Sequence, residues 1–205
     1  MPSSLPPPGH SACANEVALR LLECTRLPLD APLLDLGAGA SSFVDVLLNQ
    51  GYTNLIGVDV SAGAVAAHAR QFTPPQNDHV LWLVDDVTCA RQLPALETVQ
   101  LWHDRAMLRV LTLPTQQLAY RNTLNQMTQR GQSWVLLSVC KPGGATHLGD
   151  MSVQPYELEQ LVAFMGEDYS LQQECEYTEL FPDGTAQPCL YALFRRQNQA
   201  RPAVR

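Results

Sequence analysis

Hydrophobic positions along the chain follow two patterns, short continuous apolar runs and longer stretches with apolar residues at helical spacing. Five apolar runs predict buried strands over residues 32–36, 55–60, 80–84, 99–102 and 132–140. Helical spacing predicts helices over residues 14–26, 41–49, 61–70, 114–129 and 155–165. Two alternating segments, 170–177 and 188–196, predict a closing hairpin with its turn at Asp183-Gly184.

Strands that alternate with helices imply a parallel sheet with crossover helices, and the hairpin adds an antiparallel edge. The expected fold class is α/β, a doubly wound, mostly parallel seven-stranded sheet with helices on both faces and a C-terminal antiparallel β-hairpin. We expect one domain over residues 14–197, between a flexible Pro-rich N-terminus at 1–13 and a flexible tail at 198–205. No internal repeat and no second domain boundary is evident.

The net charge and the absence of long apolar runs limit the partners that we expect for this chain. The chain of 205 residues has 13 basic and 20 acidic residues, a formal net charge of -7, which disfavours general nucleic-acid binding. No apolar run approaches the roughly 20 residues that cross a bilayer. The first ten residues lack the cationic and apolar regions of a secretory signal. We therefore expect a cytoplasmic protein that binds neither nucleic acid nor membrane.

The six cysteines are scattered, and no two form a C-x-x-C pair. This pattern favours reduced, mostly buried thiols over a disulfide scaffold or a zinc site, and we expect no metal site. Cys140, at the end of the run 132–140, could be a nucleophile, but no base adjoins it in sequence. A buried thiol is the preferred interpretation.

The segment 33–42, L-L-D-L-G-A-G-A-S-S, leads from a strand through a glycine turn into a helix. Such turns let a ligand approach the backbone closely. The dinucleotide pattern G-x-G-x-x-G is incomplete, since its last position is Ser42. The alternative is the acidic-x-G-x-G pattern of S-adenosylmethionine (SAM) sites, with Asp35 as the acid. A carboxylate there would oppose a pyrophosphate but suits a cationic amino-acid end and a sulfonium.

Two further carboxylates follow successive predicted strands. Asp59, 22 residues after Gly37, can accept both hydroxyls of a ribose, a group that NAD and SAM share. Asp86 can accept from an adenine amino group, and Val87 can close on the ring. Its neighbour Asp85 is the weakest candidate and equally fits a residue that faces solvent. Three carboxylates without Lys or Arg in the glycine turn favour SAM over NAD.

With these motifs in order, the chain resembles the class I, seven-β-strand, Rossmann-like SAM-dependent methyltransferases over roughly residues 15–196. The segments that carry the resemblance are D-L-G-A-G-A-S, G-V-D-V-S and D-D-V-T. Within that class, W-H-D-R-A at 102–106 and the closing G-T-A-Q-P-C-L-Y-A-L-F-R-R are similar to a small bacterial subgroup. A weaker resemblance is to protein-lysine methyltransferases that act on elongation factors.

The resemblance implies SAM as the methyl donor and S-adenosylhomocysteine (SAH) as the product. It implies cofactor contacts from Asp35, Gly37, Ala38, Gly39, Asp59, Val60, Asp86, Val87 and His103. The chain departs from the family at Ser41, where a third glycine is common, and in its short N-terminal segment, where the subgroup has an aromatic lid region.

The run His103-Asp104-Arg105 has two interpretations. As catalytic residues, His103 would lie near the methyl donor as a general base, while Asp104 and Arg105 shape or charge the acceptor pocket. Alternatively, Asp104 and Arg105 form a pair that caps the next helix. Trp102 and Trp134 fit core positions better than substrate-stacking ones, and His147 and Tyr156 are acceptor-side candidates by position alone.

The predicted function is transfer of the SAM methyl group to a nitrogen, oxygen or sulfur of a small-molecule acceptor by in-line displacement. The alternatives are a protein-lysine methyltransferase and a SAM-binding sensor or partner subunit without catalysis. A NAD-dependent enzyme is the remaining possibility. We expect a monomer or homodimer.

Overall fold

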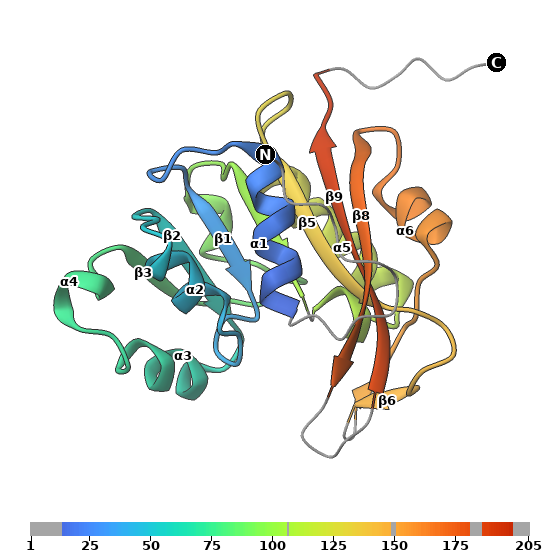
Figure 1. The fold of residues 1–205 in the computed structure, drawn as a ribbon, viewed down its shortest axis with the longest axis horizontal. Coiled ribbons are helices and arrows are strands. Elements are labelled where there is room, and N and C mark those ends of the chain that lie inside the picture. Colours follow the sequence, from blue (N-terminus) through green and yellow to red (C-terminus); the bar gives the residue numbers. More distant parts are fainter. Residues whose placement is uncertain (1–13, 106, 149–150, 181–185, 199–205) are drawn as a thin grey trace.

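A single mixed sheet of seven strands organises the computed structural model, which describes residues 14–105, 107–148, 151–180 and 186–198. The strand order is β3-β2-β1-β4-β5-β9-β8 (Figure 1). Strands β1 to β5 are parallel, whereas β9 runs antiparallel to both β5 and β8. The strands are β1 Leu33–Leu36, β2 Leu55–Asp59, β3 Val80–Val84, β4 Leu101–Asp104, β5 Trp134–Cys140, β8 Tyr169–Leu180 and β9 Ala186–Arg196.

This architecture confirms the expected fold class, including the C-terminal antiparallel hairpin. The predicted turn at Asp183-Gly184 lies outside the described residues. So do the terminal segments expected at 1–13 and 198–205, apart from Asn198.

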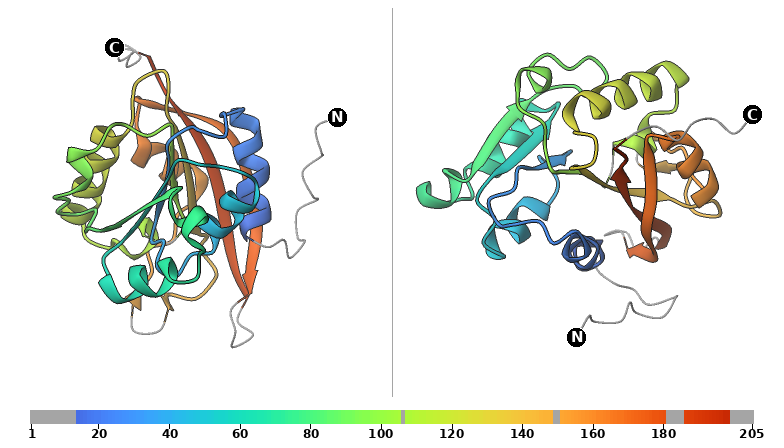
Figure 2. Two further views of the ribbon diagram at one scale, coloured as in Figure 1. Left: turned by 90° about the vertical axis from the view of Figure 1, so that its left-hand side faces the viewer. Right: turned by 90° about the horizontal axis from the view of Figure 1, so that it is seen from above.

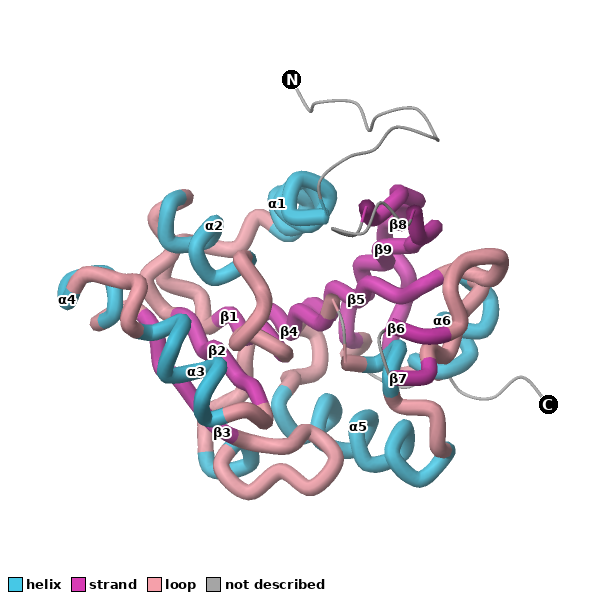
Figure 3. The backbone as a smooth tube through the Cα atoms, turned by 90° about the horizontal axis from the view of Figure 1, so that it is seen from below, coloured by secondary structure: helices cyan, strands magenta, loops and turns pink. Residues whose placement is uncertain are grey.

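Helices cover both faces of the sheet (Figures 2 and 3). One face carries α1 Ala14–Thr25, α2 Phe43–Asn49 and α3 Ala62–Ala69, and the other carries α5 Pro114–Met127 and α6 Leu158–Met165. The short elements are the helix α4 Pro74–Asn77, the 3₁₀ turns η1 Leu93–Ala95 and η2 Leu108–Val110, and the strands β6 His147–Leu148 and β7 Met151–Ser152. None of the short elements was predicted, because each has too few residues to show a period.

Each face has its own hydrophobic core. On the α1 side, Val17, Ala18, Leu21 and Leu22 are buried, as the helical spacing predicts. On the α5 side, the buried Trp102 donates its indole N–H to the Tyr120 hydroxyl at 3.0 Å, which confirms Trp102 as a core residue. Full burial of each such apolar side chain contributes about 1.5–3 kcal/mol.

Helical spacing predicts that Val46 of α2 and Leu118 of α5 face inward, but the structure buries neither side chain fully. In α2, Val44 is buried and Val46 is only partly buried. In α5, Leu118 is 60% exposed, because the buried stripe is formed by residues spaced 0, 3, 4 and 7. These residues are Tyr120, Thr123, Leu124 and Met127.

The predicted fourth strand is displaced by two residues along the chain. Val99 makes only an isolated bridge to Thr128, whereas β4 begins at Leu101. The strand then continues further than predicted, because His103 and Asp104 pair with Asp35 and Leu36 of β1. Both residues therefore belong to the rigid sheet rather than to the loop after it.

The serines before two helices behave differently. Ser61 caps α3, since its Oγ accepts the N–H of Ala64 at 3.2 Å. Ser42 occupies the N-cap position of α2 without such a bond, and its Oγ accepts instead from the Asn15 amide at 2.8 Å. The Ser41 Oγ accepts the N–H of Phe43 at 3.1 Å, so the two serines join α2 to the turn and to α1.

Within the described residues, no helix is both long and apolar enough to span a bilayer.

Candidate functional site

The strand order reverses at β1, which lies between β2 and β4. Ligands of open α/β sheets bind outside the carboxyl ends of the strands at such a switch point. Figure 3 views the molecule from this edge. The structure brings Asp35 of β1, Asp59 of β2 and His103 of β4 to this edge, with Asp86 just beyond β3.

The glycine turn after β1 uses its amide groups within the protein. The N–H groups of Gly37 and Ala38 both donate to the Val58 carbonyl, at 2.8 and 2.9 Å. The Gly39 N–H donates to the Asp59 carboxylate at 3.0 Å. A pyrophosphate needs such amides as donors, and three consecutive ones are already engaged here. The turn therefore favours a ligand that is held by acceptors.

Glycine is required at two positions of this turn. Gly37 has φ +82°, a left-handed conformation that residues with a Cβ rarely adopt. At Gly39, a Cβ would lie 2.6 Å from the Ala64 Cβ and 2.9 Å from the Asp59 Oδ2. The backbone of the turn at Gly39 therefore packs directly against the start of α3 and the end of β2. Ala38 between them is buried, and its carbonyl lies 2.7 Å from the His68 Nδ1.

Asp59 links the glycine turn to the end of β2. Its Oδ2 accepts from Gly39 and its Oδ1 accepts from the Ser61 N–H at 2.9 Å. An ionised carboxylate offers about four acceptor positions, so two remain for other donors. The next residue, Val60, is 55% exposed and offers an apolar surface beside this carboxylate.

Asp85 holds the loop after β3. Its carboxylate accepts the N–H groups of Asp86, Arg91, Gln92 and Leu93 at 2.8–3.1 Å. Burial alone would raise the pKa of Asp85, but these backbone donors outweigh it and lower the pKa. The interpretation of Asp85 as a solvent-facing residue was wrong, because the loop needs a buried acceptor for its amides.

Asp86 is partly exposed beside this loop. Its Oδ1 accepts the hydroxyl and the N–H of Thr88, at 2.7 and 2.8 Å, and the Thr88 hydroxyl is the main cause of its lowered pKa. The Val87 side chain is buried in the core cluster, and its carbonyl accepts the Thr123 hydroxyl. A ligand at this position would therefore meet the Val87 backbone rather than its side chain.

A buried chain of three polar side chains crosses the sheet from β1 to β9. The Asp35 Oδ1 lies 2.7 Å from the His103 Nδ1, and the His103 Nε2 lies 3.1 Å from the Tyr191 hydroxyl. A carboxylate can only accept, so Nδ1 carries the proton and Nε2 accepts from the phenol. Burial raises the pKa of Tyr191 well above its ordinary value, which keeps the phenol a donor.

The His103 ring is completely buried and packs on Phe43, with ring centroids 4.0 Å apart. A general base needs a nitrogen that can reach a ligand, and here both ring nitrogens bind protein groups. The Asp35 Oδ2, by contrast, is buried without a hydrogen-bond partner. An unpartnered buried acceptor is costly, so this oxygen is suited to a donor from a ligand.

Asp104 and Arg105, the next two residues along the chain, differ from His103 in their surroundings. The buried Asp104 accepts the N–H groups of Met107 and Leu108 at 2.7 and 3.0 Å, and so fixes the start of η2. This geometry matches the capping interpretation for Asp104, although the capped element is a 3₁₀ turn. Arg105 is only partly buried. His147 is exposed beside Ser152, and Tyr156 is buried with its hydroxyl bonded to Gln117.

Sequence analysis missed two residues on this side of the sheet, Tyr191 and Arg109. Tyr191 lies 88 positions from His103, and the buried Arg109 pairs with Glu179 at 3.2 Å, 70 positions away. No local spacing could have indicated these pairs. The described residues contain no group of three or more His, Cys, Asp or Glu that could hold a metal ion.

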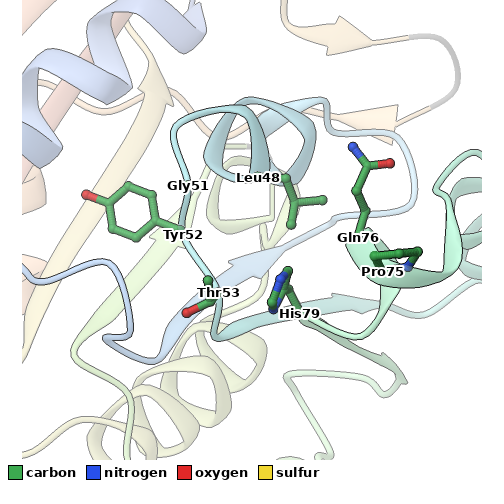
Figure 4. Close-up of a pocket in the computed structure, with 7 residues that line it drawn as sticks. All are labelled: Leu48, Gly51, Tyr52, Thr53, Pro75, Gln76 and His79. Atoms are coloured by element: carbon green, nitrogen blue, oxygen red, sulfur yellow. The ribbon is translucent and has the colours of Figure 1, made fainter.

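A pocket of about 260 Å³ lies at the opposite edge of the sheet, at the amino ends of β2 and β3 (Figure 4). Leu48, Thr53, Pro75, Gln76 and His79 contribute to its lining. None of the three carboxylates at the switch point lines it, and ligands of this sheet type bind at the other edge. We therefore assign the functional site to the switch point.

Comparisons with known proteins relate the chain to others through its fold. No protein-family model matches the chain, and no curated protein sequence matches it. A SAM-dependent methyltransferase from Methanosarcina mazei superposes with a TM-score of 0.71 and 12% identity, covering 87% of this chain and 98% of the other. One from Anabaena variabilis gives 0.68 and 16%, covering 89% and 84%.

The N-methyltransferase NodS from Bradyrhizobium japonicum, in complex with SAH, gives a TM-score of 0.67 and 17% identity. The match covers 92% of this chain and 89% of the other. The chain therefore has the fold of class I SAM-dependent methyltransferases.

Proposed function

We propose that the chain is a SAM-dependent methyltransferase that methylates a small-molecule acceptor. One observation carries the proposal. Asp35, Asp59 and Asp86 lie at the carboxyl ends of three adjacent strands, around a glycine turn whose amides are engaged within the protein. This arrangement offers acceptors to a cationic adenosyl ligand and few donors to a diphosphate. The fold supports the same conclusion.

Each carboxylate has a distinct role in this proposal. The remaining acceptor positions of Asp59 would take the two ribose hydroxyls, and the unpartnered Oδ2 of Asp35 would take the ammonium of the amino-acid end. Asp86 would accept from the adenine amino group, with the exposed Val60 against the ring. Gly37, Ala38 and Gly39 would let the ligand approach the backbone. When bound, SAM supplies an electrophilic methyl group on its sulfonium.

The residues at the end of β4 act by positioning. Since the buried His103 holds Asp35 and is held by Tyr191, it fixes the carboxylate that meets the donor. Asp104 fixes the η2 turn, and the partly buried Arg105 adds a positive charge to the acceptor side. Alignment of two bound reactants can remove about 7–11 kcal/mol of a barrier, so methyl transfer requires little further chemistry from the protein.

Calorimetry tests the donor. We expect SAH and SAM to bind, and NADH not to bind at the same concentrations. Binding of NADH without SAM or SAH would contradict the proposal.

Incubation with methyl-labelled SAM then tests the acceptor, with small-molecule and protein fractions of a lysate analysed separately. Label in small molecules supports the proposal, whereas label in a protein band would favour a protein methyltransferase. Binding without SAH formation would favour a non-catalytic sensor.

A further inference from the structure

Four side chains from distant parts of the chain meet at the carboxyl end of β5, and we call them the thiol cluster. They are Arg109 of η2, Cys140 of β5, Glu179 of β8 and Cys189 of β9. The Arg109 Nη1 lies 3.7 Å from the Cys140 Sγ and 3.2 Å from the Glu179 Oε2. The Glu179 Oε2 lies 3.9 Å from the Cys189 Sγ. Nothing in the proposed methyl transfer uses this cluster.

The two thiols lie on neighbouring strands in register. Cys140 and Cys189 are direct partners in the antiparallel β5–β9 pair. In the next pair, the Lys141 N–H donates to the Pro188 carbonyl at 2.8 Å, so that pair is the hydrogen-bonded one. The cysteine pair is therefore of the non-hydrogen-bonded kind, in which Cα atoms are only about 4.5 Å apart and side chains are closest. Disulfides span Cα separations of about 4.4–6.8 Å, so the two sulfurs can bond without moving the strands.

The neighbours of the two thiols give them different chemistry. A hydrogen bond from the Cys189 thiol and the nearby Arg109 guanidinium lower the pKa of Cys140 to about 7, against the effect of burial. The same hydrogen bond, together with burial, raises the pKa of Cys189. Of the two thiols, Cys140 is therefore the one that ionises more readily. Thiolates are the reactive form of cysteine, and Cys189 stands beside it as a thiol whose proton Glu179 can accept.

We propose that Cys140 and Cys189 are an oxidisable dithiol site that takes a hydroperoxide and closes to a disulfide. The Cys140 thiolate attacks one oxygen of hydrogen peroxide; an S–O bond forms, the O–O bond breaks, and the released hydroxide takes a proton to become water. The Cys189 sulfur then attacks the Cys140 sulfur; the S–S bond forms, the S–O bond breaks, and the hydroxide leaves with the Cys189 proton as water. Two thiols lose two electrons, and one peroxide becomes two waters.

The cluster lies close to the surface at Glu179. Both sulfurs are buried, but the Glu179 side chain is 14% exposed and reaches the surface beside them. Hydrogen peroxide is close to water in size, so it can reach a site that excludes larger thiol reagents. The other described cysteines lack such a partner: Cys24 and Cys89 are exposed, and Cys175 lies opposite Tyr191.

Peptide mapping of the full-length protein tests the proposal. Reduced protein is treated with hydrogen peroxide, quenched in acid, blocked with N-ethylmaleimide and digested after glutamate. Trypsin is unsuitable, because Lys141 precedes a proline and residues 131–195 would remain one peptide. Cleavage after glutamate places Cys140 in 98–157, Cys175 in 175–176 and Cys189 in 180–205. We expect 98–157 to be joined to 180–205 with the loss of two hydrogens, and dithiothreitol to reverse the link.

Selectivity and variants complete the test. The link should form at peroxide concentrations that leave Cys24 and Cys89 free to react with maleimide. Cys140→Ser and Cys189→Ser should abolish it. Cys189→Ser should leave a Cys140 sulfenic acid that dimedone traps once the oxidised protein is unfolded in its presence, and Cys175→Ser should form the link at the unchanged rate. Oxidation of the exposed thiols while Cys140 and Cys189 stay reduced would overturn the proposal, as would a link through Cys175. The wild-type map decides this even if a variant fails to fold.

Discussion

At the scale of single residues, the acidic side chains at the sheet edge are distinguished by what they already bind. All four of Asp85's backbone donors belong to its own loop, so it serves the fold. Asp59 accepts two bonds and retains acceptor capacity, and Asp35 has one oxygen without a partner. The unused acceptor positions, rather than the negative charges alone, mark Asp35 and Asp59 for a ligand.

Asp59→Ala tests the ribose role. Loss of this partly buried carboxylate, which is proposed to accept two ribose hydroxyls, should weaken SAM binding by about 10- to 100-fold, the equivalent of roughly 1–3 kcal/mol. Titration calorimetry measures the dissociation constant. Asp30→Ala, which removes an exposed carboxylate just before the amino end of β1, at the opposite edge of the sheet from the turn, is the matched control and should bind normally. An unchanged affinity in Asp59→Ala would remove this residue from the site.

Tyr191→Phe tests the link from β9 to Asp35. Removal of the hydroxyl leaves the buried His103 Nε2 without its partner, which should lower the free energy of unfolding by about 1–3 kcal/mol. It should also weaken SAM binding several-fold, because His103 then holds Asp35 less firmly. Urea unfolding and calorimetry measure the two effects.

Tyr177→Phe is the control for that variant. Its hydroxyl is also buried, but it bonds to Ser138 at 2.8 Å and not to the chain that ends at Asp35. It should lose stability and keep its affinity for SAM. Equal affinities in the two variants would show that Tyr191 has no role beyond the core.

The sequence could predict the acidic residues at the sheet edge but not the side chains that contact them. Asp35 was predicted from the acidic-x-G-x-G pattern, and Asp59 and Asp86 were predicted from their places at the ends of predicted strands. The carboxyl ends of parallel strands share one edge of the sheet. The His103 ring is buried because Phe43 of α2 packs on it and Tyr191 of β9 bonds to its Nε2. Such contacts between distant segments leave no periodic signal.

At the scale of elements, the glycine turn and α3 form one tightly packed unit. Gly39→Ala should lower the free energy of unfolding by about 1–3 kcal/mol, because its Cβ would strike Ala64 and Asp59. Displacement of Asp59 should weaken SAM binding as well. Denaturant unfolding and calorimetry check both.

Gly63→Ala is the matched control, since Gly63 lies in α3, the helix against which the glycine turn packs. Its Cβ would meet nothing nearer than the Ser61 Oγ at 3.9 Å, and alanine favours the helix. We expect this variant to be as stable as the wild type or more stable by about 0.5 kcal/mol. A loss similar to that of Gly39→Ala would contradict the explanation that the close contacts of the Gly39 position cause the effect.

The loop after β3 should respond to acid through Asp85. Its pKa is lower in the folded than in the unfolded protein, so its stabilising effect is complete above the ordinary value of 3.8 and is lost as the pH falls through the lower folded value. Asp85→Asn should cost about 1–3 kcal/mol at pH 7, because an amide cannot accept all four backbone donors.

Unfolding curves of the wild type and Asp85→Asn from pH 7 to pH 3 measure this effect. The difference in stability between the two proteins should shrink as the pH falls below about 4. A constant difference would show that the Asp85 carboxylate stays ionised throughout or contributes through shape alone.

The order and type of the long elements were predicted because hydrophobic periodicity survives any tertiary arrangement. The error at β4 has a physical origin. Val99 belongs to the same apolar run as Leu101, but in the structure it forms an isolated bridge with Thr128 instead of pairing within the sheet. The hairpin β6–β7 has strands of two residues each, which is too short for any pattern.

At the scale of the whole molecule, a ligand at the switch point should stabilise the complete sheet. A ligand present at 100 times its dissociation constant adds about 2.7 kcal/mol to the stability of the folded state. For a chain of this length that corresponds to a rise of roughly 5–10 °C in Tm. A thermal-shift measurement should show this rise with SAH and none with NADH at the same concentration. Equal shifts for both ligands would contradict the proposed selectivity.

The chain that joins Asp35, His103 and Tyr191 connects the first strand of the sheet to the last one along the sequence. Synthesis on the ribosome delivers the glycine turn and its three carboxylates long before β9 emerges. Until then the imidazole lacks its phenolic anchor and the middle of the sheet has an open edge. A nascent chain thus holds the three carboxylates before it can fix Asp35 through His103 and Tyr191, so we expect competence for the proposed ligand to arise only after β9 has been made.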